Sequence, residues 1–228
     1  MPELVIRAGA EDAGTKPSLT VEVFFDFVCP WCLIGKRQFD AAARRLAELR
    51  PDVRLHAVWR SHTLLPDTPA GGLPYQAFYV DRLGSPEAVA RRRAQVQQAG
   101  TTAGVRFAFE RIETLPNTAA AHAWVARAAV RGAEAQQARL IERIFTAYFM
   151  DGDDIGDASV LERLALECGL EAPRDDEAAR NEGRHVPASP RYPINGVPCF
   201  VFEGSLALSG AAGPDALLDA MLQALRAQ

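Results

Sequence analysis

The sequence predicts an α/β protein whose two strand-bearing ends enclose a long helical middle. Three observations lead to this fold class: an apolar stretch rich in β-branched and aromatic residues near the N-terminus, helical periodicity from residue 75 to about residue 182, and a return of strand character near the C-terminus. The chain has 228 residues, of which 48% are hydrophobic and 24% are charged. Such a chain can bury a core without a disulfide scaffold.

The N-terminal part predicts a parallel β-α-β unit. A strand is expected at residues 19–27, LTVEVFFDF, after a polar tail. A helix should begin at Pro30, because a proline at the first helical position gives up no useful N–H, and it should end before Pro51. The alternating segment VRLHAVWR at residues 53–60 predicts the second strand. The residues expected on the inward face of the helix are Leu33, Phe39, Ala42, Leu46 and Leu49.

The middle and the C-terminal part complete the predicted fold. Five segments with helical periodicity follow one another from Tyr75 onward, separated by Gly, Pro or Asn. The segments CFVFEG and LALSG then predict a hairpin, and PDALLDAMLQALRA predicts a closing helix. This order is that of a thioredoxin fold with an expanded middle. We expect an N-terminal tail at residues 1–18, a thioredoxin-like domain at 19–66 and 186–228, and an all-helical insertion domain at 67–185.

Charge and hydropathy exclude several classes of partner. The net charge is −4 and the arginines are dispersed, so we expect no nucleic-acid partner. No apolar stretch reaches about 18 residues without a charge, so we expect no membrane span. The N-terminus lacks the basic segment of a signal or transit peptide, which predicts a cytoplasmic location. Thiols are kept reduced there, so a close cysteine pair is more typical of catalysis, redox sensing or metal binding than of a structural bridge.

Cys29 and Cys32 lie one helical turn apart where the first strand passes into the first helix. The free N–H groups and the positive end of the helix dipole would favour the thiolate form of Cys29, which is the form that attacks disulfides. Cys32 would be less exposed and could displace a partner captured by Cys29. The alternatives are a metal site and inert buried cysteines. A closed zinc site needs two further ligands that the sequence does not offer, so we favour a redox couple without metal.

The segment INGVPCF lies in the second strand-bearing part. Pro198 follows Val197 at the start of a strand, where a cis peptide bond can shape a tight loop beside the first helix. Cys199 is expected to be a small core residue. The alternative is that the loop brings Cys199 near Cys32 for disulfide exchange.

Three polar or aromatic residues near the cysteine pair are further candidates for the site. Asp26 is expected to cap the first helix, and the alternative is a buried acid that accepts a proton from Cys32. Trp31 is expected to be exposed and to contact substrate. Lys36 either adds positive potential near the pair or is simply solvated.

Four motifs in order resemble the DsbA-like thioredoxin-fold family, and specifically its FrnE-like branch. They are DFVCPWCLIG, NTAAAH at residues 117–122, AYFMDGDDIGDASVL at residues 147–161, and GVPCF followed by SGA. The resemblance implies a thioredoxin fold interrupted by a helical domain, an active site at Cys29 and Cys32, and a loop with cis-Pro198 that holds an extended substrate beside Cys29. It also implies that Asn117 and His122 face the redox centre, whereas the residues alone favour a core histidine.

Related families of the same fold use different chemistry. Glutathione transferases of the kappa class and 2-hydroxychromene-2-carboxylate isomerases look similar around the first strand and helix, but they have serine in place of Cys29 and lack Cys32. The pair therefore favours dithiol chemistry over isomerisation. Two departures from the FrnE-like pattern bear on substrate choice: Cys199 replaces an aromatic residue, and WRSHTLLP at residues 59–66 lacks the usual Pro-Phe.

The sequence therefore predicts a thiol:disulfide oxidoreductase that acts on a disulfide- or dithiol-bearing protein or small molecule. No bound cofactor is expected beyond a redox-active disulfide, with glutathione as a candidate co-substrate, and a homodimer is left open. The alternatives are a glutathione-dependent isomerase or transferase and a non-enzymatic redox-sensing protein. The predicted site residues are Cys29 and Cys32 for catalysis, Pro30, Trp31, Val197 and Pro198 for substrate binding, and Asp26, Asn117, His122 and Cys199 as accessory residues.

Overall fold

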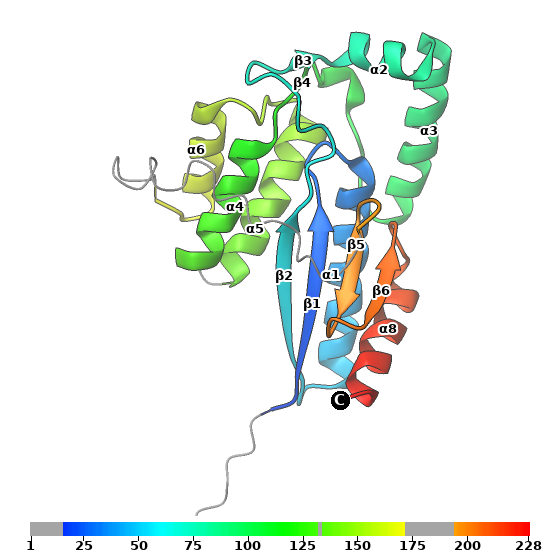
Figure 1. The fold of residues 1–228 in the computed structure, drawn as a ribbon, viewed down its shortest axis with the longest axis vertical. Coiled ribbons are helices and arrows are strands. Elements are labelled where there is room, and N and C mark those ends of the chain that lie inside the picture. Colours follow the sequence, from blue (N-terminus) through cyan, green and yellow to red (C-terminus); the bar gives the residue numbers. More distant parts are fainter. Residues whose placement is uncertain (1–15, 132–133, 172–193) are drawn as a thin grey trace, which may run out of the picture.

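A four-stranded sheet forms the centre of the molecule. The structure is a computed structural model that describes residues 16–131, 134–171 and 194–228. The strands β1 (Ser18–Phe25), β2 (Arg54–Ser61), β5 (Cys199–Phe202) and β6 (Leu206–Ser209) lie in the order β2-β1-β5-β6 (Figure 1). β1 is parallel to β2 and antiparallel to β5, and β5 and β6 form a hairpin. The predicted parallel β-α-β opening and C-terminal hairpin are therefore confirmed.

Helices α1 (Pro30–Leu49) and α8 (Pro214–Arg226) cover one face of this sheet. Side chains alternate between the faces of a strand, so the residues of β1 that point to α1 and α8 are the odd-numbered ones. Val21 and Val23 pack there with Phe39 of α1 and Met221 of α8. The opposite face carries a small buried cluster of Phe24, Cys199 and Val201.

Between β2 and β5, the residues that the structure describes form mainly helices, together with one short ladder. These helices are α2 (Tyr75–Leu83), α3 (Pro86–Thr102), α4 (Ala119–Arg131), α5 (Glu134–Thr146) and α6 (Ala158–Glu167), with a 3-10 turn at Phe109–Arg111 and a π-helical turn at Ala147–Asp151. The expected all-helical insertion also contains two paired strands of two residues each, β3 (Leu73–Pro74) and β4 (Thr114–Leu115). The predicted domain boundary at residue 186 lies outside the described residues.

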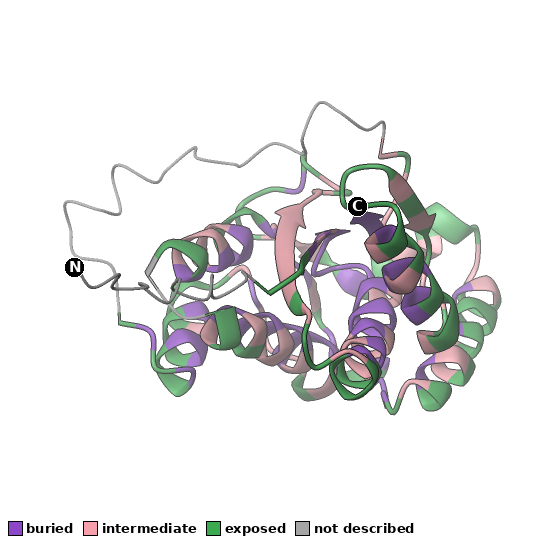
Figure 2. Cartoon of the chain, turned by 90° about the horizontal axis from the view of Figure 1, so that it is seen from below, coloured by how far each residue is buried: buried purple, intermediate pink, exposed green. Residues whose placement is uncertain are grey.

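The insertion shares its core with the C-terminal end of β1, from which the chain leads to Cys29. Phe25 and Phe27, at and just beyond the end of β1, pack with Phe145 and Tyr148 from α5 and the turn after it in one buried cluster. The rings of Phe27 and Phe145 are 4.8 Å apart between centroids. Each such side chain contributes about 1.5–3 kcal/mol when it is fully buried. In Figure 2 the buried faces of the helices turn toward this interior, while their exposed faces point outward.

Two sequence-based details are corrected. β1 ends at Phe25 and not at residue 27, because Asp26 begins a turn in which its carbonyl accepts a hydrogen bond from the Cys29 N–H. Leu49 is 61% exposed and does not belong to the inward face, because the core beneath α1 ends at Leu46.

None of the helices in the described part of the chain combines the length and apolar character needed to span a membrane.

Candidate active site

The cysteine pair lies at the start of α1. Cys29 is the residue that precedes the helix, with an extended backbone (φ −95°, ψ 108°), and Pro30 occupies the first helical turn. The Cys32 N–H donates to the Cys29 carbonyl at 3.0 Å, which closes that turn. The N–H groups of a first helical turn have no partner inside the helix, so they place positive potential beside Cys29. The two residues are brought together as the sequence predicts.

The two sulfur atoms differ in their surroundings. Cys32 is 2% exposed and Cys29 is 6% exposed, and all four cysteines are free thiols in this structure. Burial raises the pKa of the Cys32 thiol well above its usual value, and the hydrogen bond to Cys29 and the charge of Cys29 raise it further. Cys32 therefore stays protonated and can donate a hydrogen bond to the neighbouring sulfur. Both thiols are buried, and Cys32 is the more enclosed of the two.

The loop before β5 lies beside Cys29. The peptide bond between Val197 and Pro198 is cis, in agreement with what the family resemblance implies. The carbonyl oxygen of Val197 is 3.7 Å from Cys29 Sγ and accepts its hydrogen bond. On the other side, Pro198 packs so closely on Gly35 of α1 that a Cβ at this glycine would lie 2.8 Å from Pro198 Cγ. The loop that contains Val197 and Pro198 therefore contacts both the sulfur of Cys29 and Gly35 of α1.

Asp26 is a buried acid and not a cap of α1. Its side chain is 0% exposed, Oδ1 lies 3.1 Å from His122 Nε2, and Oδ2 accepts from the Leu64 N–H at 2.7 Å. The side chain of Cys29 makes no cap hydrogen bond either. Burial raises the pKa of Asp26, but the hydrogen bond and charge of His122, with donors from Leu64 and Thr118, outweigh it and leave the pKa lowered. The expected helix cap is therefore wrong.

His122 reaches this acid from α4 of the insertion. It is 2% exposed, and its ring centroid lies 5.1 Å from that of Phe25 and 5.0 Å from that of Phe27. The histidine is buried, as the residue pattern predicts, and it also lies near the redox centre through its contact with Asp26. Its Nδ1 atom has no hydrogen-bond partner among the residues that the structure describes.

The other accessory residues lie farther from the reaction centre. Asn117 precedes α4, where its Nδ2 donates to the Thr68 carbonyl and its Oδ1 accepts from the Ala119 N–H. Cys199 is buried on the face of the sheet opposite to α1, and its sulfur accepts from the Ser209 hydroxyl at 3.8 Å. The structure therefore does not bring Cys199 to Cys32.

Two expectations about neighbouring side chains are corrected. Trp31 is half-buried and not exposed, because the Arg92 guanidinium lies 5.6 Å from its ring centroid. Lys36 is neither solvated nor free. It is 4% exposed, and its Nζ lies 2.8 Å from Asp40 and 2.9 Å from Glu142. The pair with Glu142 joins α1 to α5 of the insertion.

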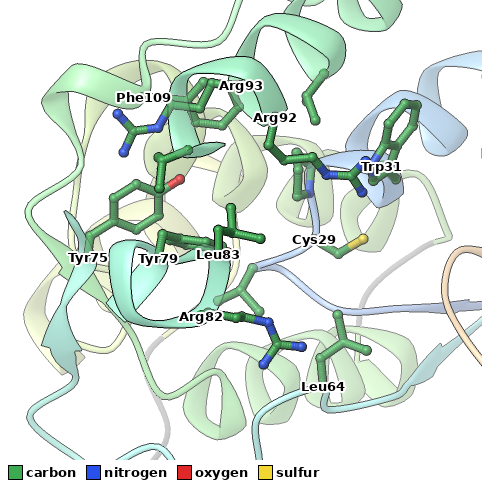
Figure 3. A pocket seen from close by; sticks show the side chains of 14 residues that line it. Cys29, Trp31, Leu64, Tyr75, Tyr79, Arg82, Leu83, Arg92, Arg93 and Phe109 are labelled. Atoms are coloured by element: carbon green, nitrogen blue, oxygen red, sulfur yellow. The ribbon is translucent and has the colours of Figure 1, made fainter. Parts of the chain in front are cut away.

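A cavity of about 290 Å³ opens beside Cys29. Cys29 and Trp31 lie on one side of it, and side chains of α2 and α3 lie on the other, including Tyr75, Tyr79, Arg82 and Arg92 (Figure 3). Val28 and Val96 also line the cavity. Sequence reasoning missed the side chains of α2 and α3. The run of arginines at residues 91–93 is a visible signal in the sequence, but it does not reveal which of them faces Cys29. Within the described residues, no group of three or more His, Cys, Asp or Glu could hold a metal ion.

The sheet order, the Cys-x-x-Cys pair at a helix start and the cis-proline loop beside it define a thioredoxin-fold protein. The profile of the DSBA-like thioredoxin domain family matches residues 20–222, and the chain belongs to this family. The resemblance to DsbA-like proteins and the thioredoxin fold with a helical insertion are thereby confirmed.

The comparisons with individual proteins agree with this family. The chain is 27% identical to the uncharacterized protein YwbO of Bacillus subtilis (strain 168) over 206 residues, which is 86% of this chain and 92% of YwbO. Among solved structures, the probable DsbA oxidoreductase SCO1869 from Streptomyces coelicolor has a TM-score of 0.77 at 22% identity, covering 92% of this chain and 91% of its own.

Two further structures share the fold at lower similarity. A 2-hydroxychromene-2-carboxylate isomerase has a TM-score of 0.62 at 18% identity, with 91% of this chain and 97% of its own covered. The cytosolic disulfide reductase DsbM from Pseudomonas aeruginosa, solved with glutathione, has a TM-score of 0.59 at 19% identity, with 91% and 99% covered. At these identities the likeness concerns the fold alone.

Proposed function

We propose that the protein is a thiol:disulfide oxidoreductase in which Cys29 is the nucleophile and Cys32 the resolving cysteine. The observation that carries this proposal is the asymmetry of the pair. Cys29 lies at the N-terminal end of α1 beside the Val197 carbonyl, and Cys32 is a buried thiol one turn further on whose pKa is raised. The thiolate form of a cysteine is the species that attacks a disulfide.

The exchange then proceeds in two balanced steps. The Cys29 thiolate attacks one sulfur of the substrate disulfide, so the substrate S–S bond breaks, a Cys29–substrate disulfide forms, and the other half leaves as a thiolate. Cys32 then loses its proton and attacks Cys29 Sγ, which breaks the mixed disulfide and releases the second thiolate. The protein ends with a Cys29–Cys32 disulfide, and the substrate has gained two electrons. Reversal of both steps oxidises a dithiol.

The surroundings of the pair suit these steps. The carboxylate charge of Asp26 raises the pKa of Cys32, whereas a hydrogen bond with the backbone of Asp26 lowers that pKa. Asp26 therefore lies close enough to influence the proton that leaves Cys32 during resolution. We propose that Asp26, positioned by His122, accepts that proton. Val197 and Pro198 would hold the substrate chain beside Cys29, with Pro30 and Trp31 on the other side. In this proposal the thioredoxin-like domain is 19–66 with 186–228, and the insertion at 67–185 supplies His122.

The proposal extends to co-substrate and location. Glutathione is proposed as the small thiol that exchanges with the pair, since the fold-neighbour DsbM was solved with glutathione. A cytoplasmic location is proposed, as DsbM is described as cytosolic. The alternative of a glutathione-dependent isomerase stays a prediction, because the 2-hydroxychromene-2-carboxylate isomerase shares only the fold with this chain. The cysteines at positions 29 and 32 favour dithiol exchange over that alternative.

The test is equilibration of the purified protein with glutathione redox buffers, followed by alkylation and mass detection of free thiols. We expect Cys29 and Cys32 to become protected from alkylation together, because they are oxidised as one two-electron couple. Cys32→Ser should accumulate a glutathione adduct on Cys29, Cys29→Ser should form no adduct on Cys32, and Cys168→Ser, which changes the cysteine directly after α6, should behave as wild type. Independent oxidation of the two cysteines, or tight glutathione binding with no disulfide, would contradict the proposal and favour the isomerase.

A further inference from the structure

The cavity beside Cys29 is lined by arginines without a matching acid. Arg82 of α2 and Arg92 and Arg93 of α3 lie on its wall, and no aspartate or glutamate of the described residues lines it. Arg82 and Arg92 form no ion pair within the described part of the chain. The hydrogen bond of Arg92 goes to Gln95 at 3.4 Å, and Arg82 lies over the ring of Phe78. Elsewhere the pattern differs, since Arg143 and Arg163 each pair with two carboxylates.

Arg93 is held more firmly than the other two. Its guanidinium donates to Gln76 at 2.8 Å and lies 5.2 Å from the ring centroid of Tyr75, and its Nε is buried without a hydrogen-bond partner among the described residues. Figure 3 shows Arg82 and Arg92 reaching from α2 and α3 toward the wall formed by Cys29 and Trp31. Three arginines thus line the cavity beside Cys29, and two of them, Arg82 and Arg92, form no ion pair among the described residues.

The remaining walls are apolar. Val28, Leu64, Leu83, Val89 and Val96 all line the cavity. A volume of about 290 Å³ is at the lower end of the range for small-molecule sites, so the cavity accommodates one compact arm of a molecule and not a folded partner. Guanidinium groups bind carboxylates in a two-pronged geometry, and they do so more strongly where water is partly excluded.

We infer that this cavity selects small disulfides in which a carboxylate lies on a compact, partly apolar arm next to the sulfur. The inference rests on the proposed exchange at Cys29 and names its substrate class. The carboxylate binds Arg82 and Arg92, and the apolar part of the arm packs between Leu64 and Val96. The arm's sulfur then lies at Cys29, where the thiolate attacks it, the substrate S–S bond breaks, and the other half departs as a thiolate. Cys32 displaces the bound arm as its thiolate and leaves a protein disulfide.

The test compares two chromogenic disulfides with the fully reduced protein. Dithiobis(nitrobenzoate) carries a carboxylate on each compact aromatic arm, and dithiodipyridine is neutral and of similar size. Complete exchange at Cys29 and Cys32 releases two coloured thiols from either reagent. In a Cys168→Ser, Cys199→Ser background no other cysteine contributes, so second-order rate constants come directly from absorbance. Because each variant is compared with wild type for both reagents, the intrinsic reactivity of the reagents cancels in the ratio.

The variants isolate the two cations. We expect the double variant Arg82→Gln, Arg92→Gln to lower the anionic-to-neutral rate ratio about tenfold, and each single variant to lower it by about threefold, as for partly exposed ion pairs. The charge-matched control is Arg91→Gln with Arg106→Gln, two exposed arginines of the same region that do not line the cavity. In wild type the ratio should also fall as salt is raised, since screening weakens the attraction.

The outcomes separate this inference from the proposed function. Reaction with both reagents but an unchanged ratio in the double variant overturns the inference and leaves the exchange proposal intact. An equal fall in the control variant also overturns it, because the selectivity would then come from net charge alone. Failure to release two thiols with either reagent overturns the exchange proposal itself.

Discussion

His122 Nε2 lies 3.1 Å from Asp26 Oδ1, and the two side chains are 2% and 0% exposed. The contact joins α4 of the insertion to the end of β1, next to the cysteine pair. A carboxylate in this position is stable only with partners, because removing one partner of a buried ionic contact typically costs about 3–5 kcal/mol. The insertion therefore contributes a buried side chain to the surroundings of Cys29 and Cys32.

The first prediction concerns the dependence of stability on pH. His122, Leu64 and Thr118 hold the pKa of Asp26 below 3.8 despite its burial. A carboxyl whose pKa is lower in the folded state stabilises the fold above its unfolded pKa and loses this contribution as pH falls through the folded pKa. Asp26→Asn keeps the shape but cannot ionise. We expect wild type to be more stable than Asp26→Asn by about 1–3 kcal/mol at neutral pH, and the difference to shrink below pH 3.8.

Urea unfolding at a series of pH values measures this difference. Because both proteins share every other carboxylate, the titrations of those carboxylates cancel in the comparison. If the advantage of wild type grows as pH falls below 3.8, burial and not His122 dominates the pKa of Asp26, and the explanation is wrong.

The second prediction concerns the contact between α1 and the Pro198 loop. A Cβ at Gly35 would lie 2.8 Å from Pro198 Cγ and 3.3 Å from Phe200 Cζ, closer than such atoms normally approach. Gly35→Ala should gain up to about 1 kcal/mol of helix propensity but lose about 1–3 kcal/mol from overpacking. We expect a net loss of stability and slower reaction of Cys29 with iodoacetamide, as the loop is displaced.

The matched control is Gly71→Ala, where an added Cβ would meet no atom within 4 Å. Thermal unfolding and alkylation rates of both variants provide the measurement. A Gly35→Ala protein with the stability and Cys29 reactivity of wild type would show that the Pro198 loop accommodates the added Cβ with no loss in the free energy of unfolding.

The third prediction concerns Lys36, which is 4% exposed between Asp40 and Glu142. Lys36→Met keeps the length of the apolar side chain but leaves both carboxylates without their buried cation. The two acids retain some contact with water, so we expect a loss of about 2 kcal/mol in the free energy of unfolding.

The exposed pair of Arg45 and Asp215 offers the comparison. These side chains are 45% and 83% exposed. Arg45→Met should therefore change stability by less than about 1 kcal/mol. Denaturant unfolding of both variants measures the loss in the free energy of unfolding. Equal losses would mean that the buried ion pairs of Lys36 stabilise the fold no more than the exposed pair does.

The sequence by itself determined the elements and their order. Hydrophobic periodicity and breaker residues act locally, so the start of α1 at Pro30, the parallel partner of β1 and the C-terminal hairpin could all be predicted. The position of Cys29 and Cys32 at a helix start followed from the same local signals, as did the burial of Cys32.

Only the tertiary structure decided which distant residues meet. Asp26 and His122 are 96 positions apart, and Cys29 and Val197 are 168 apart. Periodicity shows that a residue faces inward but not which residue it will touch. For that reason Asp26 was expected as a cap, and neither expectation for Lys36 named its buried ion pairs with Asp40 and Glu142. The arginine wall of the cavity comes from α2 and α3, whose placement against Cys29 depends on the packing of the insertion core and on no local pattern.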